Sequence, residues 1–192
     1  RLQATDIPFT TIKWGVWIWL LAALSGFIFH GKQCALADYY RNIHLFFIKG
    51  KSGSELDNSV KLRQELKSLS WKEDGMWLVF LYFYGNYTHS QEQMTPHFQA
   101  FRQQIMERFG DAPVPTTLAQ AFRQRSLPLI KYANILTFNT RAIVLYIVLL
   151  LGQPWLYFVF EIVVMGLLFL FMRAKHESLC QSLTQELQQG KY

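Results

Sequence analysis

Two long apolar blocks, separated by a polar region, limit the fold of this sequence more than any other feature. Residues 12–29 form an 18-residue run in which Lys13, at its edge, is the only charged residue. As a helix this run would be about 27 Å long, close to the roughly 30 Å hydrocarbon core of a bilayer. Tryptophans gather in its first half, and tryptophan favours the membrane interface. We therefore expect residues 1–30 to contain a first transmembrane helix.

The second apolar block, residues 134–172, is too long for one straight membrane crossing. It would extend about 58 Å as a single helix. Gly152 and Pro154 interrupt it near the middle, and proline removes a backbone donor that a helix needs. The simplest interpretation is a transmembrane helical hairpin that turns at these residues. A single kinked helix is the alternative.

The distribution of charge predicts how these helices are oriented. Residues 30–131 hold 13 Lys and Arg against 9 Asp and Glu, whereas the hairpin turn is uncharged. Arg173 and Lys175 follow the last helix directly. By the positive-inside rule, the long connection and the tail 173–192 should be cytoplasmic, in a multi-pass protein of the inner (cytoplasmic) membrane. The net charge of +6 suits a membrane surface or a phosphate-bearing ligand, and we expect no nucleic-acid partner.

The connecting section, residues 31–133, has the periodicity of helices rather than strands. A helix should begin at Thr95 and Pro96 and end at Gly110. A further short helix should begin near Thr117 and end near Pro128. Residues 76–84 are intensely apolar but too few to span a membrane, so they should be buried against the bundle or lie in the interface. The predicted architecture is all-α: an integral membrane helical bundle with about three transmembrane helices and a helical cytoplasmic section.

Motifs for common enzyme chemistry are missing. Gly50 and Lys51 suggest a phosphate loop, but the first glycine of a Walker A motif is replaced by Leu45. The histidines lack zinc-ligand spacing, and no nucleophile motif is found. Cys34 and Cys180 lie far apart, as expected of two reduced thiols. We therefore predict neither a catalytic residue nor a metal ligand in this chain.

The candidate binding residues are cations near the membrane and polar residues within the second apolar block. Cations at a membrane face can contact a lipid head group or a substrate phosphate, although ordinary juxtamembrane cations look the same. Charges at membrane depth are expensive and mark functional sites by default. The predicted phosphate or head-group contacts are Lys131, Arg141, Arg41, Lys49 and Lys51, and the predicted intramembrane polar residues are Asn134, Asn139 and Glu161. For Glu161 the alternative is a structural hydrogen bond across the hairpin.

Four segments together resemble a known family. They are residues 30–41, 49–57, 127–136 and 154–161. They resemble the C-terminal part of CDP-alcohol phosphatidyltransferase-like membrane proteins of the Bacteroidetes type, and the resemblance extends over most of the chain. The diagnostic motif of that family, D-x2-D-G-x2-A-R-x8-G-x3-D-x3-D, is absent. Gly53 and Asp57 reproduce one G-x3-D step, but Lys61 stands where the last aspartate belongs. No catalytic aspartate can be carried over.

The resemblance implies part of a phospholipid-synthesis transferase. That reaction joins a CDP-alcohol to an acceptor alcohol, gives a phosphodiester and releases CMP. It implies a divalent metal, magnesium or manganese, held by aspartates that this chain lacks. Because the chain begins with Arg1, we expect those aspartates to precede it in a longer protein. The partners would be membrane lipid, the two alcohol substrates and a second copy of the chain. The alternative is a non-catalytic membrane scaffold or lipid-binding protein.

Overall fold

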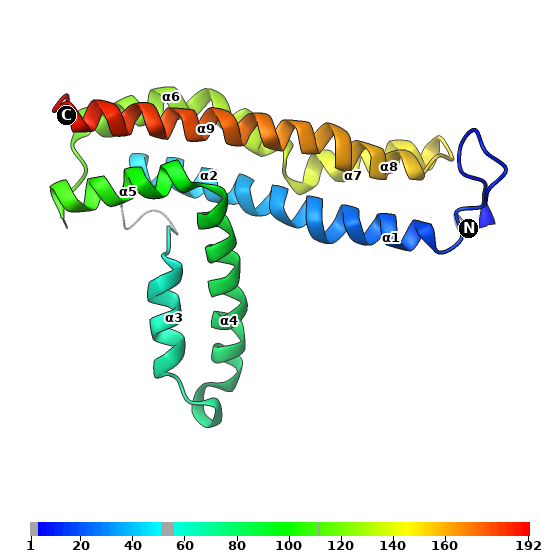
Figure 1. Ribbon diagram of the computed structural model, residues 1–192, viewed down its shortest axis with the longest axis horizontal. Coiled ribbons are helices and arrows are strands. Elements are labelled where there is room, and N and C mark those ends of the chain that lie inside the picture. Colours follow the sequence, from blue (N-terminus) through cyan, green and yellow to red (C-terminus); the bar gives the residue numbers. More distant parts are fainter. Residues whose placement is uncertain (1–3, 51–55, 111) are drawn as a thin grey trace. The chain divides into compact units, whose positions relative to one another are not determined.

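The computed structural model describes residues 4–50, 56–110 and 112–192, and the regular secondary structure in these ranges is helical (Figure 1). The first long helix contains α1 (Trp17–Ala23), the π-helical segment η2 (Leu24–His30) and α2 (Gly31–Lys49). Then follow α3 (Ser59–Ser68), α4 (Trp71–Met94) and α5 (Pro96–Phe109). The last elements are α6 (Thr116–Ile135), α7 (Phe138–Leu150), α8 (Trp155–Val159), the π-helical η4 (Phe160–Val164) and α9 (Met165–Gln188).

Three helical stretches are long and apolar enough to cross a membrane. They are Trp17–Lys49, Thr116–Leu150 and Trp155–Gln188, with 33, 35 and 34 residues. A straight helix of this many residues would be about 50 Å long, whereas the hydrocarbon core is about 30 Å thick, so each stretch has more residues than one crossing needs. The prediction of an all-α membrane protein with about three transmembrane helices is confirmed.

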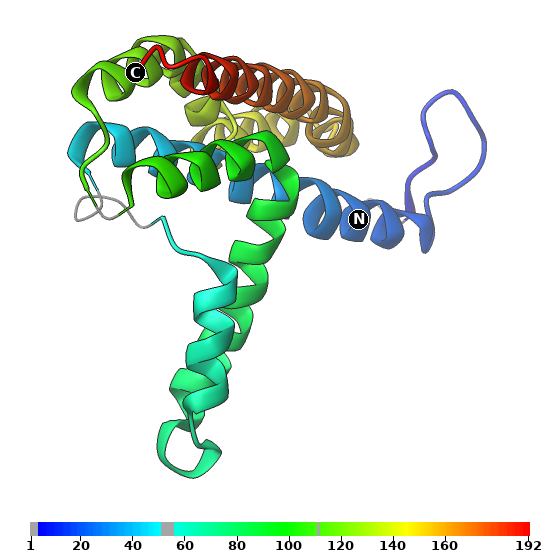
Figure 2. The ribbon, with the colours of Figure 1, turned by 60° about the vertical axis from the view of Figure 1, so that its left-hand side comes forward.

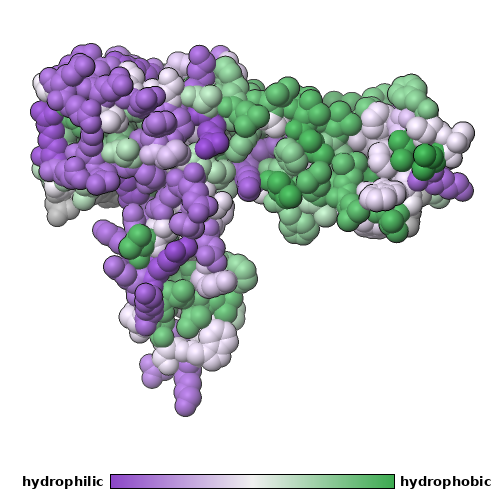
Figure 3. Space-filling model, in the orientation of Figure 1, coloured by the Kyte–Doolittle hydropathy of each residue, from purple (hydrophilic) through white to green (hydrophobic). Residues whose placement is uncertain are grey.

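The chain divides into two compact units. Among the described residues, unit 1 contains 4–37 and 134–171, and unit 2 contains 38–133 and 172–192. The apolar parts of the three long stretches belong to unit 1, and Figure 3 shows hydrophobic side chains over α1, α7 and α8. We therefore treat 17–37, 134–151 and 155–171 as the membrane-spanning segments. The polar continuations of the same helices belong to unit 2.

The first helix begins later than the apolar run that predicts it. Helix α1 starts at Trp17, whereas the run starts at residue 12. Gly15 has φ +49°, and Phe9 has φ 66°, so the preceding chain cannot be helical at these points. An isolated bridge joins Asp6 to Lys13 there. Hydropathy measures where the chain is apolar, but backbone conformation decides where the helix starts.

The second apolar block forms a helical hairpin. Helix α7 ends at Leu150 and α8 begins at Trp155. Gly152 has φ +68°, a left-handed conformation that glycine adopts without a Cβ penalty. Pro154 is the N-cap of α8, where its missing N–H is harmless. The chain reverses here, so a single kinked helix over this block does not form.

The helices of the connecting section match three of the predicted boundaries, including the start of α6 at Thr116, and miss one. Helix α5 runs from Pro96 to Phe109 and ends at Gly110, which has φ +56°, as predicted. The helix predicted to end near Pro128 instead continues through it to Ile135 as α6. A proline inside a helix loses one hydrogen bond and commonly kinks it, but neighbouring packing can sustain the helix. The packing of α6 continues on both sides of Pro128: Phe122 and Ser126 before it and Ala133 after it are buried.

Aromatic side chains form the core of unit 2. The Phe47 ring stacks on Phe122, with centroids 4.0 Å apart, and on Phe101, at 5.9 Å. Tyr39 meets Phe98 edge to face at 5.9 Å. These rings come from α2, α5 and α6, and they are almost fully buried. Such pairs add to the hydrophobic gain from burial and fix how the three helices pack.

Helices α3 and α4 form an antiparallel pair within unit 2 (Figure 2). Asn58 caps α3 by accepting hydrogen bonds from the N–H groups of Val60 and Lys61. A Cβ added at Gly85 of α4 would lie 3.9 Å from the Leu62 Cβ, at ordinary van der Waals distance, so α3 and α4 are in contact there. The apolar segment 76–84 lies in α4 with one face outward: Leu81 is buried, whereas the side chains of Met76, Trp77, Phe80 and Phe83 are exposed.

Candidate functional site: a buried ion pair beside an apolar groove

An ion pair lies inside the membrane-spanning part of unit 1. The Arg141 Nε donates to both carboxylate oxygens of Glu161, each at 3.0 Å. Both side chains are only 1% exposed. Arg141 belongs to α7 and Glu161 to η4, so the pair joins the two arms of the hairpin. Charges at this depth normally face a partner, and here each charge has the other.

The remaining donors of Arg141 are also satisfied within unit 1. Its Nη1 donates to the carbonyl oxygens of Leu136 and Thr137, and its Nη2 donates to the Gln33 side-chain oxygen. Gln33 in turn donates through Nε2 to the backbone oxygen of Glu161, at 3.3 Å. The network therefore connects three segments of unit 1: the start of α2, the start of α7, and η4.

Local backbone irregularities make this network fit. Helix α6 ends at Ile135 and α7 begins at Phe138, so the carbonyl groups of Leu136 and Thr137 lie at the break between them. An arginine one turn later can therefore reach these carbonyl oxygens. Glu161 lies in a π-helical segment, and such segments commonly occur at functional positions of helices.

His30 and Cys34 extend the network along the first helix. The His30 Nδ1 lies 3.4 Å from a Glu161 carboxylate oxygen, and its Nε2 lies 3.7 Å from the Cys34 sulfur. Cys34 also donates to the Leu136 carbonyl oxygen at 3.7 Å. Because the His30 side chain is 38% exposed, this end of the network reaches the surface of unit 1.

An apolar groove of about 300 Å³ lies next to the network in unit 1. Its two walls come from the first helix and from η4 with the start of α9. Gly166 leaves room on one wall, since a Cβ there would lie 3.7 Å from the Phe29 ring. Lys32 and Gln33 are the polar residues of the lining. The lining residues are Ile28, Phe29, Lys32, Gln33, Ile162, Val163, Gly166, Leu167, Phe169 and Leu170.

The structure brings together only part of the predicted site. Arg141 and Glu161 form the ion pair, which agrees with the structural interpretation of Glu161 and leaves the Arg141 guanidinium enclosed by protein groups. Asn134 and Asn139, in contrast, are exposed. Each belongs to unit 1, and the Asn134 carbonyl oxygen accepts hydrogen bonds from the N–H and the hydroxyl of Thr137.

The predicted cations of the connecting section belong to unit 2. The Lys131 Nζ lies 4.9 Å from the centre of the Tyr132 ring. Lys49 is exposed at the end of α2, and Arg41 is half-buried. Lys51 lies outside the described residues. Their role as phosphate contacts stays a prediction.

Sequence reasoning missed Gln33 as a member of the site. The available signal was the spacing from His30, because positions three and four residues apart share one helix face. His30, Gln33 and Cys34 have this spacing directly after the first apolar run. The groove itself has no sequence signal, because its two walls are more than a hundred residues apart in the chain.

The divalent metal implied by the family resemblance does not fit the described residues. Magnesium and manganese prefer several oxygen ligands from carboxylates. Asp57 accepts a hydrogen bond from the Tyr84 hydroxyl at 2.7 Å, and Asp74 accepts from the Ser70 N–H at 3.1 Å, each at a separate place. Within the described ranges, no cluster of carboxylates offers such a site.

Comparisons with protein-family models, with curated proteins and with solved structures gave no match. The fold and the site therefore define the class: an all-α, multi-pass membrane protein with a buried Arg–Glu pair and an apolar groove in its membrane-spanning unit.

Proposed function

We propose that this protein binds a membrane phospholipid in the groove of unit 1. The observation that carries the proposal is the groove itself, which is apolar along its length and has an exposed lysine, Lys32, in its lining. An acyl chain matches the apolar walls, and a lipid phosphate matches a lysine ammonium. Gln33 lies in the same lining, and its side-chain oxygen accepts a hydrogen bond from Arg141.

Binding in such a groove depends on packing and charge rather than on removal of apolar surface from water. Lipid tails outside the protein are as apolar as the groove walls. Shape and the phosphate contact must therefore provide the preference for one lipid over another. Gly166 lies at a position where shape matters: a Cβ there would be in ordinary contact with the Phe29 ring, and a larger side chain would enter the groove.

The proposal can be tested by measuring phospholipid that stays bound to the purified full-length chain in detergent, by native mass spectrometry. Gly166→Leu should fill the groove and remove most of the bound lipid. Gly26→Leu is the matched control, because a Cβ at Gly26 has nothing within 4 Å. Lys32→Ala should keep the lipid-binding groove but reduce the preference for anionic over neutral phospholipid. Equal lipid retention by Gly166→Leu and Gly26→Leu would refute the proposal.

A transferase of phospholipid biosynthesis is the second candidate function, and the resemblance of the four segments favours it. This chain would then supply the lipid-holding helices of a CDP-alcohol phosphatidyltransferase, and the metal-binding aspartates would come from sequence before Arg1. The reaction would be attack by the acceptor hydroxyl on the CDP-alcohol phosphorus, with CMP leaving. An open reading frame upstream that carries D-x2-D-G-x2-A-R, together with CMP release by the longer protein, would support this candidate. An initiator methionine directly before Arg1 would refute it.

For the membrane and its sidedness, the Lys and Arg content supports the inner (cytoplasmic) membrane, with the connecting section and the C-terminus in the cytoplasm. A reporter fused after Tyr192 that is active only in the cytoplasm tests this orientation. Activity only of a reporter that requires export would contradict it.

A further inference from the structure

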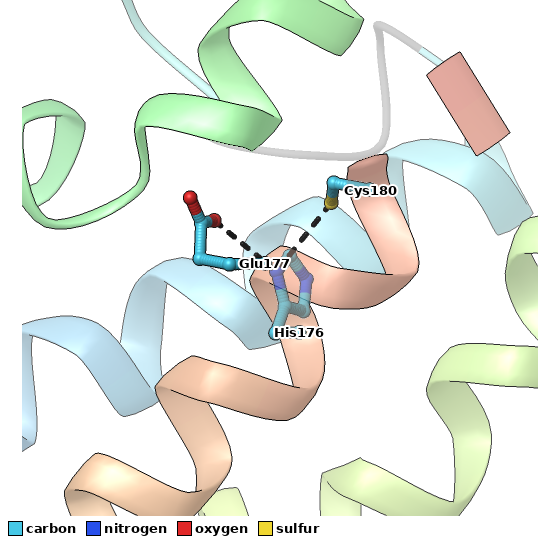
Figure 4. A group of neighbouring side chains, drawn as sticks. All are labelled: His176, Glu177 and Cys180. Atoms are coloured by element: carbon cyan, nitrogen blue, oxygen red, sulfur yellow. Dashed lines mark hydrogen bonds and ion pairs between the residues drawn. The ribbon is translucent and has the colours of Figure 1, made fainter. Parts of the chain in front are cut away.

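His176, Glu177 and Cys180 form a cluster of possible metal ligands in unit 2 (Figure 4). The Glu177 carboxylate and the Cys180 sulfur both lie near one ring nitrogen of His176. All three belong to the polar half of α9. The His176 Nδ1 lies 3.6 Å from the Cys180 sulfur and 4.0 Å from the Glu177 Oε1. His176 and Cys180 are four residues apart and therefore share a helix face, and the Glu177 carboxylate turns toward the same nitrogen.

The cluster is buried and incompletely satisfied. Glu177 has its Oε2 fixed by the backbone N–H of His97 at 2.7 Å, whereas its Oε1 has no hydrogen-bond partner. The Glu177 side chain is 9% exposed and that of His176 is 2% exposed. The Tyr40 ring stacks on the His176 ring, with centroids 3.8 Å apart. The Tyr40 hydroxyl is also buried without a hydrogen-bond partner. Buried polar atoms are normally paired, so unpaired ones in a cluster suggest a missing ligand.

We propose that His176, Glu177 and Cys180 form a binding site for a zinc ion. Imidazole, thiolate and carboxylate are the protein ligands of zinc. Tetrahedral bond lengths place a nitrogen and a sulfur ligand about 3.6 Å apart, which the His176 and Cys180 atoms already match. A nitrogen and an oxygen ligand lie about 3.4 Å apart, so the Glu177 Oε1 would have to come about half an ångström closer to the His176 Nδ1.

The surroundings suit a metal of this kind. Burial lowers the pKa of His176, so its imidazole is neutral, the form that coordinates. Burial, with the Glu177 charge, raises the pKa of the Cys180 thiol, so zinc has to displace its proton on binding. Tyr40, Phe98 and Phe122 surround the His176 ring and hold its orientation. With Nδ1 on the metal, the ring proton would lie on Nε2, which is buried without a hydrogen-bond partner among the described residues.

The pair His30 and Cys34 shows why spacing alone does not make a zinc site. It has the same four-residue spacing, and His30 also has a nearby carboxylate, that of Glu161. However, the sulfur lies near the His30 Nε2 and the carboxylate near its Nδ1, on different ring nitrogens. An ion bound to the His30 Nε2 would lie near the Cys34 sulfur, and an ion bound to the Nδ1 would lie near the Glu161 carboxylate, but no single ion could bind both. This pair is therefore the matched control for the cluster on α9.

The test uses the full-length chain purified in detergent, stripped with a chelator and then titrated with zinc or cobalt(II). Metal content per chain and the thiolate-to-cobalt charge-transfer absorption are the measurements. We expect one zinc per chain and a charge-transfer band in the unmodified protein and in Cys34→Ser. Cys180→Ser should lose the band, and Glu177→Gln should weaken zinc binding about ten-fold or more.

The outcomes separate the proposal from a metal-free hydrogen-bonded cluster. Helix content, measured by circular dichroism, identifies any variant that fails to fold. If Cys180→Ser fails to fold, Glu177→Gln, which keeps the size of the side chain, replaces it in the comparison. Substoichiometric zinc in the unmodified chain would overturn the proposal. So would a charge-transfer band that survives Cys180→Ser but disappears in Cys34→Ser.

Discussion

Arg141 and Glu161 lie 20 residues apart in the chain, and the Arg141 Nε is 3.0 Å from both oxygens of the Glu161 carboxylate. The hairpin turn at Gly152 and Pro154 brings them together. Each charge is almost fully buried in a membrane-spanning segment, so each depends on the other for its stability. The consequences of this relationship can be measured.

Removing one partner of the pair should strongly destabilise the protein. Arg141→Met leaves the Glu161 carboxylate buried without its cation. We expect a loss of about 3–5 kcal/mol in the free energy of unfolding, as for other buried pairs broken on one side. Unfolding in mixed detergent micelles with increasing dodecyl sulfate, followed by circular dichroism, measures this value.

The double variant Arg141→Met with Glu161→Leu is the control for that measurement. Because it buries no unpaired charge, it should be more stable than Arg141→Met alone. Equal stability of the single variant and the unmodified protein would show that the pair contributes nothing, which would contradict the geometry.

Gln33 should be more important for stability than the exposed asparagine of α7. Gln33→Leu leaves the Arg141 Nη2 without its acceptor, and a buried donor left unpaired costs about 1–3 kcal/mol. Asn139→Leu changes an exposed position and should alter the free energy of unfolding by about 0.5 kcal/mol or less. The same detergent unfolding series measures both. Equal losses in the two variants would mean that Gln33 is not part of a connected network.

The contact between Glu186 and Arg125 should make stability depend on pH in the acid range. Arg125 donates to both Glu186 oxygens, at 2.6 and 3.1 Å, and Lys191 adds a contact at 2.6 Å. The hydrogen bonds from Arg125 and then Lys191 hold the pKa of Glu186 well below its usual value. The stabilisation is therefore present above the unfolded-state pKa, about 4.3, and is lost as the pH falls toward the folded-state pKa.

Glu186→Gln measures the size of this effect. The Arg125 side chain is 38% exposed, so we expect the contact to contribute less than about 1 kcal/mol at neutral pH. The difference in the free energy of unfolding between the unmodified protein and Glu186→Gln should shrink between pH 5 and pH 3, because the unfolded state takes up a proton there. A difference that grows toward acid would contradict the assigned direction of the pKa.

The exposed apolar face of α4 is expected to lie in a bilayer interface. Trp77 is 48% exposed, Phe80 51% and Phe83 67%, and Trp71 at the start of the helix is 66% exposed. Aromatic rings with this exposure suit the interface between head groups and acyl chains. In vesicles, phospholipid with a nitroxide near its head group should quench part of the fluorescence of the unmodified protein. That part should disappear in the Trp71→Phe, Trp77→Phe double variant.

Tryptophans elsewhere in the chain can also be quenched by the nitroxide, so the double variant is needed to measure their share. Only the difference between the unmodified protein and that variant reports on α4. If both lose the same fraction of their fluorescence, the face does not contact lipid, and another surface must cover it.

The limits of periodicity are clearest in α6 and at the two histidine–cysteine pairs. Proline is a strong helix-ending signal, yet α6 continues through Pro128, because packing on both sides outweighs one missing hydrogen bond. His30 and His176 have the same spacing to a cysteine. Their surroundings differ because the orientation of each ring depends on neighbours from other helices. Local sequence does not contain that information.

The sequence by itself determined the class of fold. Two apolar blocks, the break at Gly152 and Pro154, and the start and end of α5 follow from hydropathy and from the backbone limits of glycine and proline. The tertiary structure alone decided the partners. Arg141 donates to Glu161, and it also reaches Gln33, 108 residues away. The physical reason is that burial in a bilayer makes a charge find a partner, while chain folding in three dimensions selects which partner is within reach.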